Sequence, residues 1–143
     1  MRLTLPIACV FALAHLAIGQ DADQTTTYKR TVLVFCKETL PLCKMVIEGA
    51  PPLALAEFDK QHKKITAAWI AMKAAPDEHL DIEKACRAIW LGVDKTRQSL
   101  TLTHELIALR GEDAPAVKQA IAKDRKYMQD MKALLERIEK KMK

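Results

Sequence analysis

The C-terminal part of the chain carries the clearest periodic pattern of hydrophobic and polar side chains. From Asp113 onward, hydrophobic residues recur at alternating steps of four and three, and charged residues fill most positions between them. This spacing gathers the hydrophobic side chains along one side of a helix and is typical of heptad-patterned, coiled-coil-like packing. We therefore expect a helix over residues 113–142, with Asp113 as its N-cap and Pro115 in its first turn. The stripe consists of Val117, Ile121, Asp124, Met128, Met131, Leu135, Ile138 and Met142.

Two stretches upstream show the same kind of pattern. We expect one helix over residues 77–110, between Pro76 and Gly111, and another over residues 52–75, which prolines bound at both ends. Both carry hydrophobic residues at helical spacing and polar residues on the remaining positions. The stripe of the first contains Ile82, Cys86, Ile89, Val93, Leu100, Thr103 and Ile107, and the stripe of the second contains Phe58, His62, Ile65, Trp69 and Met72.

Residues 27–48 are expected to form a fourth helix. Its stretch "TVLVF" is hydrophobic on all sides, which is typical of a helix buried on several faces, with a short β-strand as the alternative. Pro41 should kink this helix, because proline lacks the amide hydrogen and clashes with the carbonyl of Lys37. The stripe contains Val32, Cys36, Leu40, Cys43 and Ile47.

Four amphipathic helices joined by short turns predict an all-α, antiparallel four-helix bundle. The helix over residues 77–110 would span about 50 Å and its predecessor only about 35 Å. The last two helices should therefore form an extended hairpin that projects from the bundle, unless the first segment covers it. Exposed hydrophobic surface of this kind marks an interaction or ligand face. The residues expected on that face are Leu100, Ile107, Val117 and Ile121.

The N-terminal residues resemble a secretory signal peptide. Arg2 supplies a positive charge, a hydrophobic run follows from Leu3 to Ile18, and small residues precede a cleavage point after Gly19. A membrane anchor is the alternative, but the run is shorter than the ~20 residues that a membrane span needs. We therefore expect residues 1–19 to be a signal peptide and residues 20–143 to be a single secreted, extracellular domain without a transmembrane segment.

Three cysteines remain in that domain, and an oxidising compartment favours a disulfide. Cys36 and Cys43 would lie about 10.5 Å apart along a straight helix, beyond the ~7 Å between Cα atoms that a disulfide tolerates. Cys36 and Cys86 each lie about 13 Å from the same end of the bundle if the helices alternate in direction. We therefore predict a Cys36–Cys86 disulfide, which leaves Cys43 as a buried free thiol or an exposed thiol that links two chains.

Polar residues interrupt the stripes at a few positions. Arg97 and Asp124 lie fourteen and thirteen residues from Gly111 on either side of the turn, so a hairpin would place them at one level. We expect a structural ion pair that fixes the register of the two helices, with a catalytic carboxylate as the alternative. His62 is expected to be a partly buried histidine with a polar neighbour, the alternative being a ligand or a pH-sensitive group.

The net charge and the absence of known motifs narrow the expected class of function. The net charge is +5, and falls to +4 without residues 1–19, which is weak evidence for a polyanionic partner, so we expect no nucleic-acid binding. The sequence carries no serine-triad order, glycine-rich phosphate loop, paired-carboxylate motif or zinc spacing, so we expect no catalytic residue, cofactor or metal site. The expected function is that of a secreted, non-enzymatic interaction module with an unknown protein partner, including another copy of itself as a homodimer. A carrier of fatty acids or other small apolar ligands is the alternative, followed by a binder of lipid surfaces or glycans.

Overall fold

The structure is a computed structural model that describes residues 8–51 and 53–143, with side chains described from residue 22 onward. This part of the chain is 88% helical and contains no strand, which confirms the predicted all-α class. The helices and the short 3₁₀ turn η1 are α1 (Ala8–Glu48), α2 (Leu55–Ala71), η1 (Asp77–His79), α3 (Leu80–Arg110) and α4 (Pro115–Met142).

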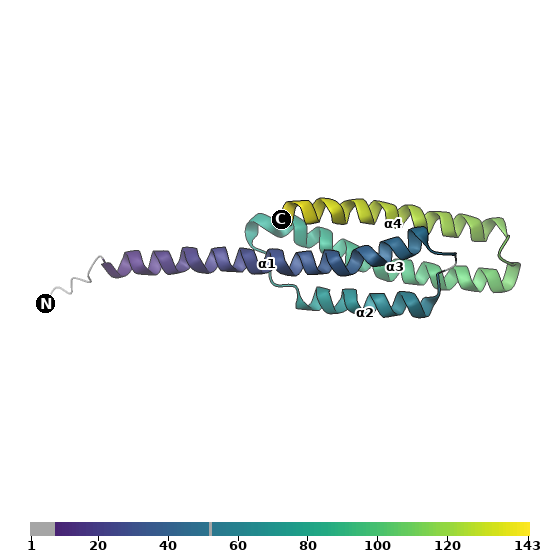
Figure 1. Ribbon diagram of the computed structural model, residues 1–143, viewed down its shortest axis with the longest axis horizontal. Coiled ribbons are helices and arrows are strands. Elements are labelled where there is room, and N and C mark those ends of the chain that lie inside the picture. Colours follow the sequence, from purple (N-terminus) through teal and green to yellow (C-terminus); the bar gives the residue numbers. More distant parts are fainter. Residues whose placement is uncertain (1–7, 52) are drawn as a thin grey trace.

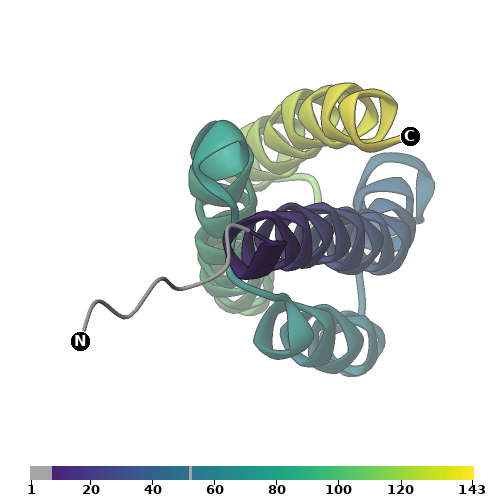
Figure 2. The ribbon, with the colours of Figure 1, turned by 90° about the vertical axis from the view of Figure 1, so that its left-hand side faces the viewer.

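The four helices pack side by side as a bundle (Figure 1). The closely packed pairs among them are α1–α2, α2–α3, α3–α4 and α1–α4, so α1 and α3 lie diagonally across the bundle from each other. Figure 2 looks along the bundle and shows α1 between α2 and α4. The far ends of α3 and α4 extend beyond the turn that joins α1 to α2 (Figure 1).

The hydrophobic stripes predicted from the sequence form the core. Each helix contributes side chains that are fully buried, because an amphipathic helix is stable only when its hydrophobic side is removed from water. The largest fully buried side chains include Tyr28, Phe35, Phe58, Leu42, Ile65, Met128, Leu135, Val32, Val93 and Val117.

The observed helix boundaries refine the predicted ones. The helix expected over residues 27–48 is continuous through Pro41, and the stretch "TVLVF" is helical rather than a strand. The Gln61 side chain on α2 donates a 2.6 Å hydrogen bond to the carbonyl oxygen of Glu38, one turn before the proline. The helix expected over residues 52–75 is shorter at both ends, and α4 begins at Pro115 with Ala114 rather than Asp113 as its N-cap.

The predicted signal peptide, residues 1–19, falls partly outside the described residues. Residues 1–7 are not described, and only helical backbone is described for Ala8 to Gly19. Within the described residues, every helix lacks the length or the hydrophobicity that a membrane crossing requires.

Candidate functional site

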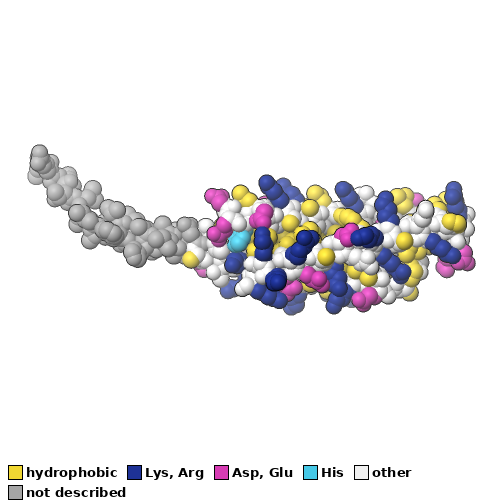
Figure 3. All heavy atoms as spheres, turned by 90° about the horizontal axis from the view of Figure 1, so that it is seen from above, with side chains coloured by type: hydrophobic (Ala, Val, Ile, Leu, Met, Phe, Trp, Pro, Cys, Tyr) yellow, Lys and Arg dark blue, Asp and Glu magenta, His cyan; other side chains and the backbone are white. Residues whose placement is uncertain are grey.

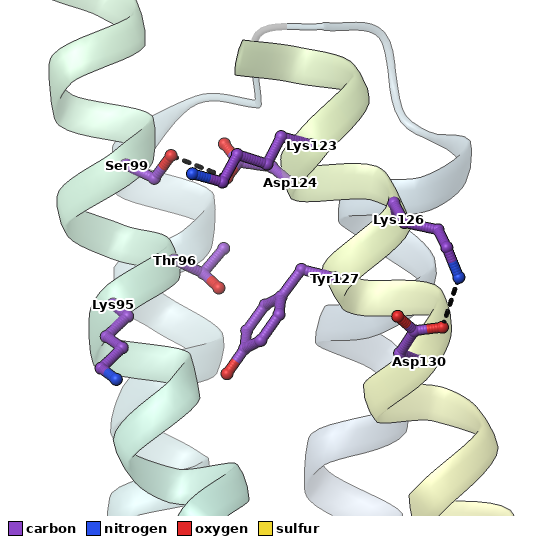
Figure 4. A pocket seen from close by; sticks show the side chains of 8 residues that line it. All are labelled: Lys95, Thr96, Ser99, Lys123, Asp124, Lys126, Tyr127 and Asp130. Carbon is purple, nitrogen blue, oxygen red and sulfur yellow. Dashed lines mark hydrogen bonds and ion pairs between the residues drawn. The ribbon is translucent and has the colours of Figure 1, made fainter. Parts of the chain in front are cut away.

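A groove runs between α3 and α4 near the middle of both helices (Figure 4). Its volume is about 410 Å³, which falls within the range of ligand pockets in proteins, roughly 300–1,000 Å³. Hydroxyl, carboxyl and ammonium groups from both helices face it. The lining residues are Lys95, Thr96, Ser99, Lys123, Asp124, Lys126, Tyr127 and Asp130.

Asp124 is the buried polar residue of this groove, with 7% of its surface exposed. The Ser99 hydroxyl donates a 2.7 Å hydrogen bond to its Oδ1 atom, and its Oδ2 atom has no hydrogen-bond partner among the described residues. Burial raises the pKa of the Asp124 carboxyl, and the hydrogen bond from Ser99 and the charge of Lys123 offset only part of that effect. The carboxyl therefore keeps the capacity to accept one further hydrogen bond.

Tyr127 closes one side of the groove by crossing from α4 toward α3 (Figure 4). Gly92 makes this approach feasible, because a Cβ atom at that position would overlap the Tyr127 hydroxyl and lie 2.9 Å from the Met131 methyl carbon. The absence of a side chain at Gly92 is thus a local sequence feature that shapes the groove.

The charges around the groove are only partly paired. Lys126 forms a 2.7 Å ion pair with Asp130, whereas Lys95 and Lys123 have no ion-pair partner in the part of the chain that the structure describes. Each of these unpaired ammonium groups can attract an acidic group of a small ligand. The described histidines lie elsewhere: His62 contacts Asp94, His79 contacts Glu78, and His104 contacts the carbonyl oxygen of Leu53.

The predicted Arg97–Asp124 ion pair is wrong. Arg97 instead contacts Asp59 on α2 through two hydrogen bonds of 2.7 and 3.0 Å, and Asp124 accepts its bond from Ser99. Positions 97 and 99 differ by about 200° around a helix, so the two side chains point toward different neighbours. Asp124 thus contacts a residue two positions from Arg97 along α3, and Arg97 points in a different direction around the helix from the one predicted.

A polar ladder consequently joins α2 and α3. Asp59 pairs with Arg97, and one turn away His62 Nε2 lies 2.8 Å from Asp94 Oδ1. The hydrogen bond from Arg97 lowers the pKa of Asp59, with smaller contributions from the charges of Arg97, His62 and Lys63. The prediction that His62 is a partly buried histidine with a polar neighbour is confirmed, since 21% of its side chain is exposed.

The predicted Cys36–Cys86 disulfide is absent from the structure, in which Cys36, Cys43 and Cys86 are buried free thiols. Both predicted partners belong to the buried core. They come, however, from the diagonal helices α1 and α3. Diagonal helices lie farther apart than adjacent ones, whose axes are about 8–10 Å apart, and this makes the ~7 Å between Cα atoms that a disulfide tolerates harder to reach.

Burial decides the state of these thiols. It raises the pKa of each of the three to about 12. Cys43, predicted as a buried thiol or an exposed one that links two chains, has no exposed surface. A buried, protonated thiol reacts slowly, because the thiolate is the nucleophile.

The predicted interaction face is mostly covered. Leu100 and Val117 are buried, and Ile107 and Ile121 are half-buried, so the set does not form an exposed hydrophobic face. The end of α1 and the connection to α2 close over part of it, because Met45, Gly49 and Leu53 line a small cavity together with Leu100 and Ile121.

Exposed hydrophobic residues lie instead on the outer face of α3. Leu80, Leu91, Leu102 and Leu109 are 45%, 48%, 59% and 82% exposed. The stripe predicted for this helix contains only buried or half-buried positions and does not include these four leucines. The signal that identifies them is a spacing of eleven residues from Leu80 to Leu91 and from Leu91 to Leu102, which equals three helical turns to within about 20°.

No cluster of three or more His, Cys, Asp or Glu side chains among the described residues could hold a metal ion. Comparison of the chain with protein-family models, with curated proteins and with solved structures found no match.

Proposed function

We propose that the protein is a secreted, non-enzymatic, antiparallel four-helix bundle that acts as an extracellular protein-interaction module. The observation that carries this proposal is the outer face of α3, where four leucines are exposed on one helix. Exposed hydrophobic surface has a free-energy cost in water, and a protein partner would remove it.

Contacts between the helices support the antiparallel arrangement. In each successive pair, the contacted residue numbers fall in the second segment as they rise in the first, and the last two helices form the extended hairpin of this proposal. The contacts are Thr31 with Lys73 and Glu38 with Gln61, Asp59 with Arg97 and His62 with Asp94, and Asp81 with Lys141 and Ser99 with Asp124.

The packing of the bundle favours an interaction module over a carrier that opens around its ligand. The small cavity beside Leu53, Leu100 and Ile121 has a volume of about 20 Å³. A cavity of this size holds about one water molecule, far less than a fatty acyl chain needs.

The α3–α4 groove is the observation that favours the alternative function, a carrier of small ligands. Its volume suits a small molecule, and Lys95 and Lys123 would face the acidic group of a fatty acid or similar compound. Binding of lipid surfaces or glycans receives less support. Figure 3 shows Lys and Arg side chains scattered among acidic and hydrophobic ones on one face of the molecule, rather than gathered into a basic patch.

Native mass spectrometry of protein purified from the medium of its own source tests the proposal. The expected result is the molecular mass of a chain that starts at Gln20. This chain should carry a co-purifying protein or a second copy, and no small ligand. Stoichiometric lipid on a monomer would replace the interaction module with the carrier. Retention of the protein inside cells would contradict the secreted location.

A further inference from the structure

The four exposed leucines of α3 form a single stripe. At about 100° per residue, Leu80, Leu91, Leu102 and Leu109 lie within about 40° of one another around the helix axis. The stripe runs along the side of α3 that faces away from the core, since Ile82, Ile89, Val93 and Leu100 on the other side are buried. Leu91 and Leu102 lie in its middle, about 16 Å apart along the axis.

Two oppositely charged residues flank this stripe on the same edge. Arg87 and Glu105 each lie about 40° to the same side of Leu91, and the opposite edge carries Lys95. Arg87 forms an ion pair of 3.3 Å with Glu83 within α3, and 62% of the Arg87 side chain is exposed. Such an exposed pair exchanges partners at little cost. Glu105 is exposed and has no ion-pair partner among the described residues.

We propose that the partner of this surface is a second copy of the same chain, packed antiparallel so that Leu91 of each copy faces Leu102 of the other. This inference rests on the proposed function as an interaction module and specifies its partner. A two-fold axis then passes level with the midpoint between positions 96 and 97 of α3. In such a symmetric interface the same patch of both copies is buried.

Charge complementarity selects this orientation. Arg87 lies about 14 Å before the axis and Glu105 about 13 Å after it, and both are on the same edge of the stripe. A two-fold axis perpendicular to the helices brings residues of the same edge together, so two Arg87–Glu105 pairs form across the interface. A parallel arrangement would instead bring opposite edges of the stripe together at the same level, so Arg87 and Glu105 would not meet.

The same geometry predicts a weak dimer. The overlap runs from about Lys84 to Leu109, roughly 37 Å of a single helix pair, which is small for a protein–protein interface. The two copies of Lys95 lie on the other edge about 4.5 Å apart along the axis and repel each other. We therefore expect micromolar dissociation constants, with tighter association of the Lys95→Gln variant.

The test is sedimentation velocity of the full chain over a range of protein concentrations. The unmodified protein should dimerise reversibly, and Leu91→Glu should weaken association by about a hundredfold or more, because it buries a charge in the interface. Val34→Glu is the matched control, since Val34 is 46% exposed but lies on α1, outside the stripe. Circular dichroism checks that each variant remains folded.

Charge exchange tests the orientation. Arg87→Glu and Glu105→Arg should each weaken the dimer about tenfold, and the double variant should restore it. A dimer that tolerates Leu91→Glu, or double-variant association no stronger than that of the single variants, would overturn the inference. A protein that stays monomeric at all concentrations would also overturn the proposed dimer. The interaction-module proposal has a separate test: it would fail if the native protein carried neither a protein partner nor a second copy.

Discussion

Asp124 combines burial with an incomplete set of hydrogen bonds. Ser99 satisfies one carboxyl oxygen, and the other has no partner among the described residues. Burial raises the pKa of this carboxyl, so the folded state binds a proton more readily than the unfolded state does. The contribution of this carboxyl to protein stability is therefore present at low pH. It falls as the pH rises from the pKa of the carboxyl in the unfolded chain, ~3.9, through its pKa in the folded protein.

The pH dependence of this stability contribution leads to a prediction for Asp124→Asn. The asparagine keeps an acceptor for Ser99 and cannot ionise. At neutral pH the variant should be more stable than the unmodified protein by about 1 kcal/mol, since the charged carboxyl is no longer buried. The difference should shrink as the pH falls through the raised folded pKa toward ~3.9, and it should stay constant at lower pH. Chemical denaturation at a series of pH values measures it, with Ser99→Ala as a control that should destabilise the protein. Equal stability at every pH would show that Asp124 is well solvated.

The thiols give a second prediction at this scale. Because Cys36, Cys43 and Cys86 are buried with pKa values raised to about 12, Ellman's reagent should modify none of them rapidly in the native protein. Addition of denaturant without reductant should expose all three. Detection of a single thiol under those conditions, with a Cys36–Cys86 peptide in a digest, would restore the disulfide that the sequence suggested.

At the scale of the elements, the polar ladder between α2 and α3 sets their register. Arg97 holds the pKa of Asp59 below its usual range, so this pair stabilises the folded state above the unfolded pKa of Asp59, and that contribution is lost as the pH falls through the folded pKa. The dependence is opposite in sign to that of Asp124, because the Asp59 carboxylate is half-buried and paired with Arg97, whereas the Asp124 carboxyl is buried without an ion-pair partner among the described residues.

A double-mutant cycle with Asp59→Asn and Arg97→Gln tests this pair. Each single variant should lower the melting temperature modestly at neutral pH, and the coupling between them should disappear at low pH and weaken with salt. The Glu83–Arg87 pair, which lies within α3, is a suitable control because it does not join two helices. A silent cycle at neutral pH and low salt would show that packing alone sets the register.

At the scale of the whole molecule, the far ends of α3 and α4 extend beyond the turn that joins α1 to α2 (Figure 1), and the hydrophobic residues near these ends are distributed differently from the predicted exposed face. Val117 is buried between the helices, and Leu109 near the end of α3 is 82% exposed. The inner residues therefore contribute to the packing of the bundle, and the outer leucines form the surface that we propose for a partner.

Two charge substitutions separate these roles. Val117→Asp should destabilise the protein by about 3 kcal/mol or more, because it buries an unpaired charge. Leu109→Asp should change stability by about 0.5 kcal/mol or less, since the site is in water. Thermal unfolding at concentrations too low for association measures both. If Val117→Asp left the stability unchanged, Val117 would belong to the exposed face predicted from the sequence.

The sequence by itself determined the helical class, the approximate helix boundaries and most of the core. Stripes at helical spacing report which side of each helix avoids water, and this is a local property of the chain. Val93, Met128 and Leu135 were placed in the core in this way and are buried.

Only the tertiary structure decided which helices are neighbours and which way each polar side chain points. A stripe gives the level of a residue along a helix, but a two-residue offset turns a side chain by about 200°, as Arg97 and Ser99 illustrate. Cys36 and Cys86 lie on the diagonal helices α1 and α3 and remain free thiols, and the end of α1 and its connection to α2 cover part of the surface around Leu100. These outcomes depend on packing between segments distant in sequence, which no local pattern encodes.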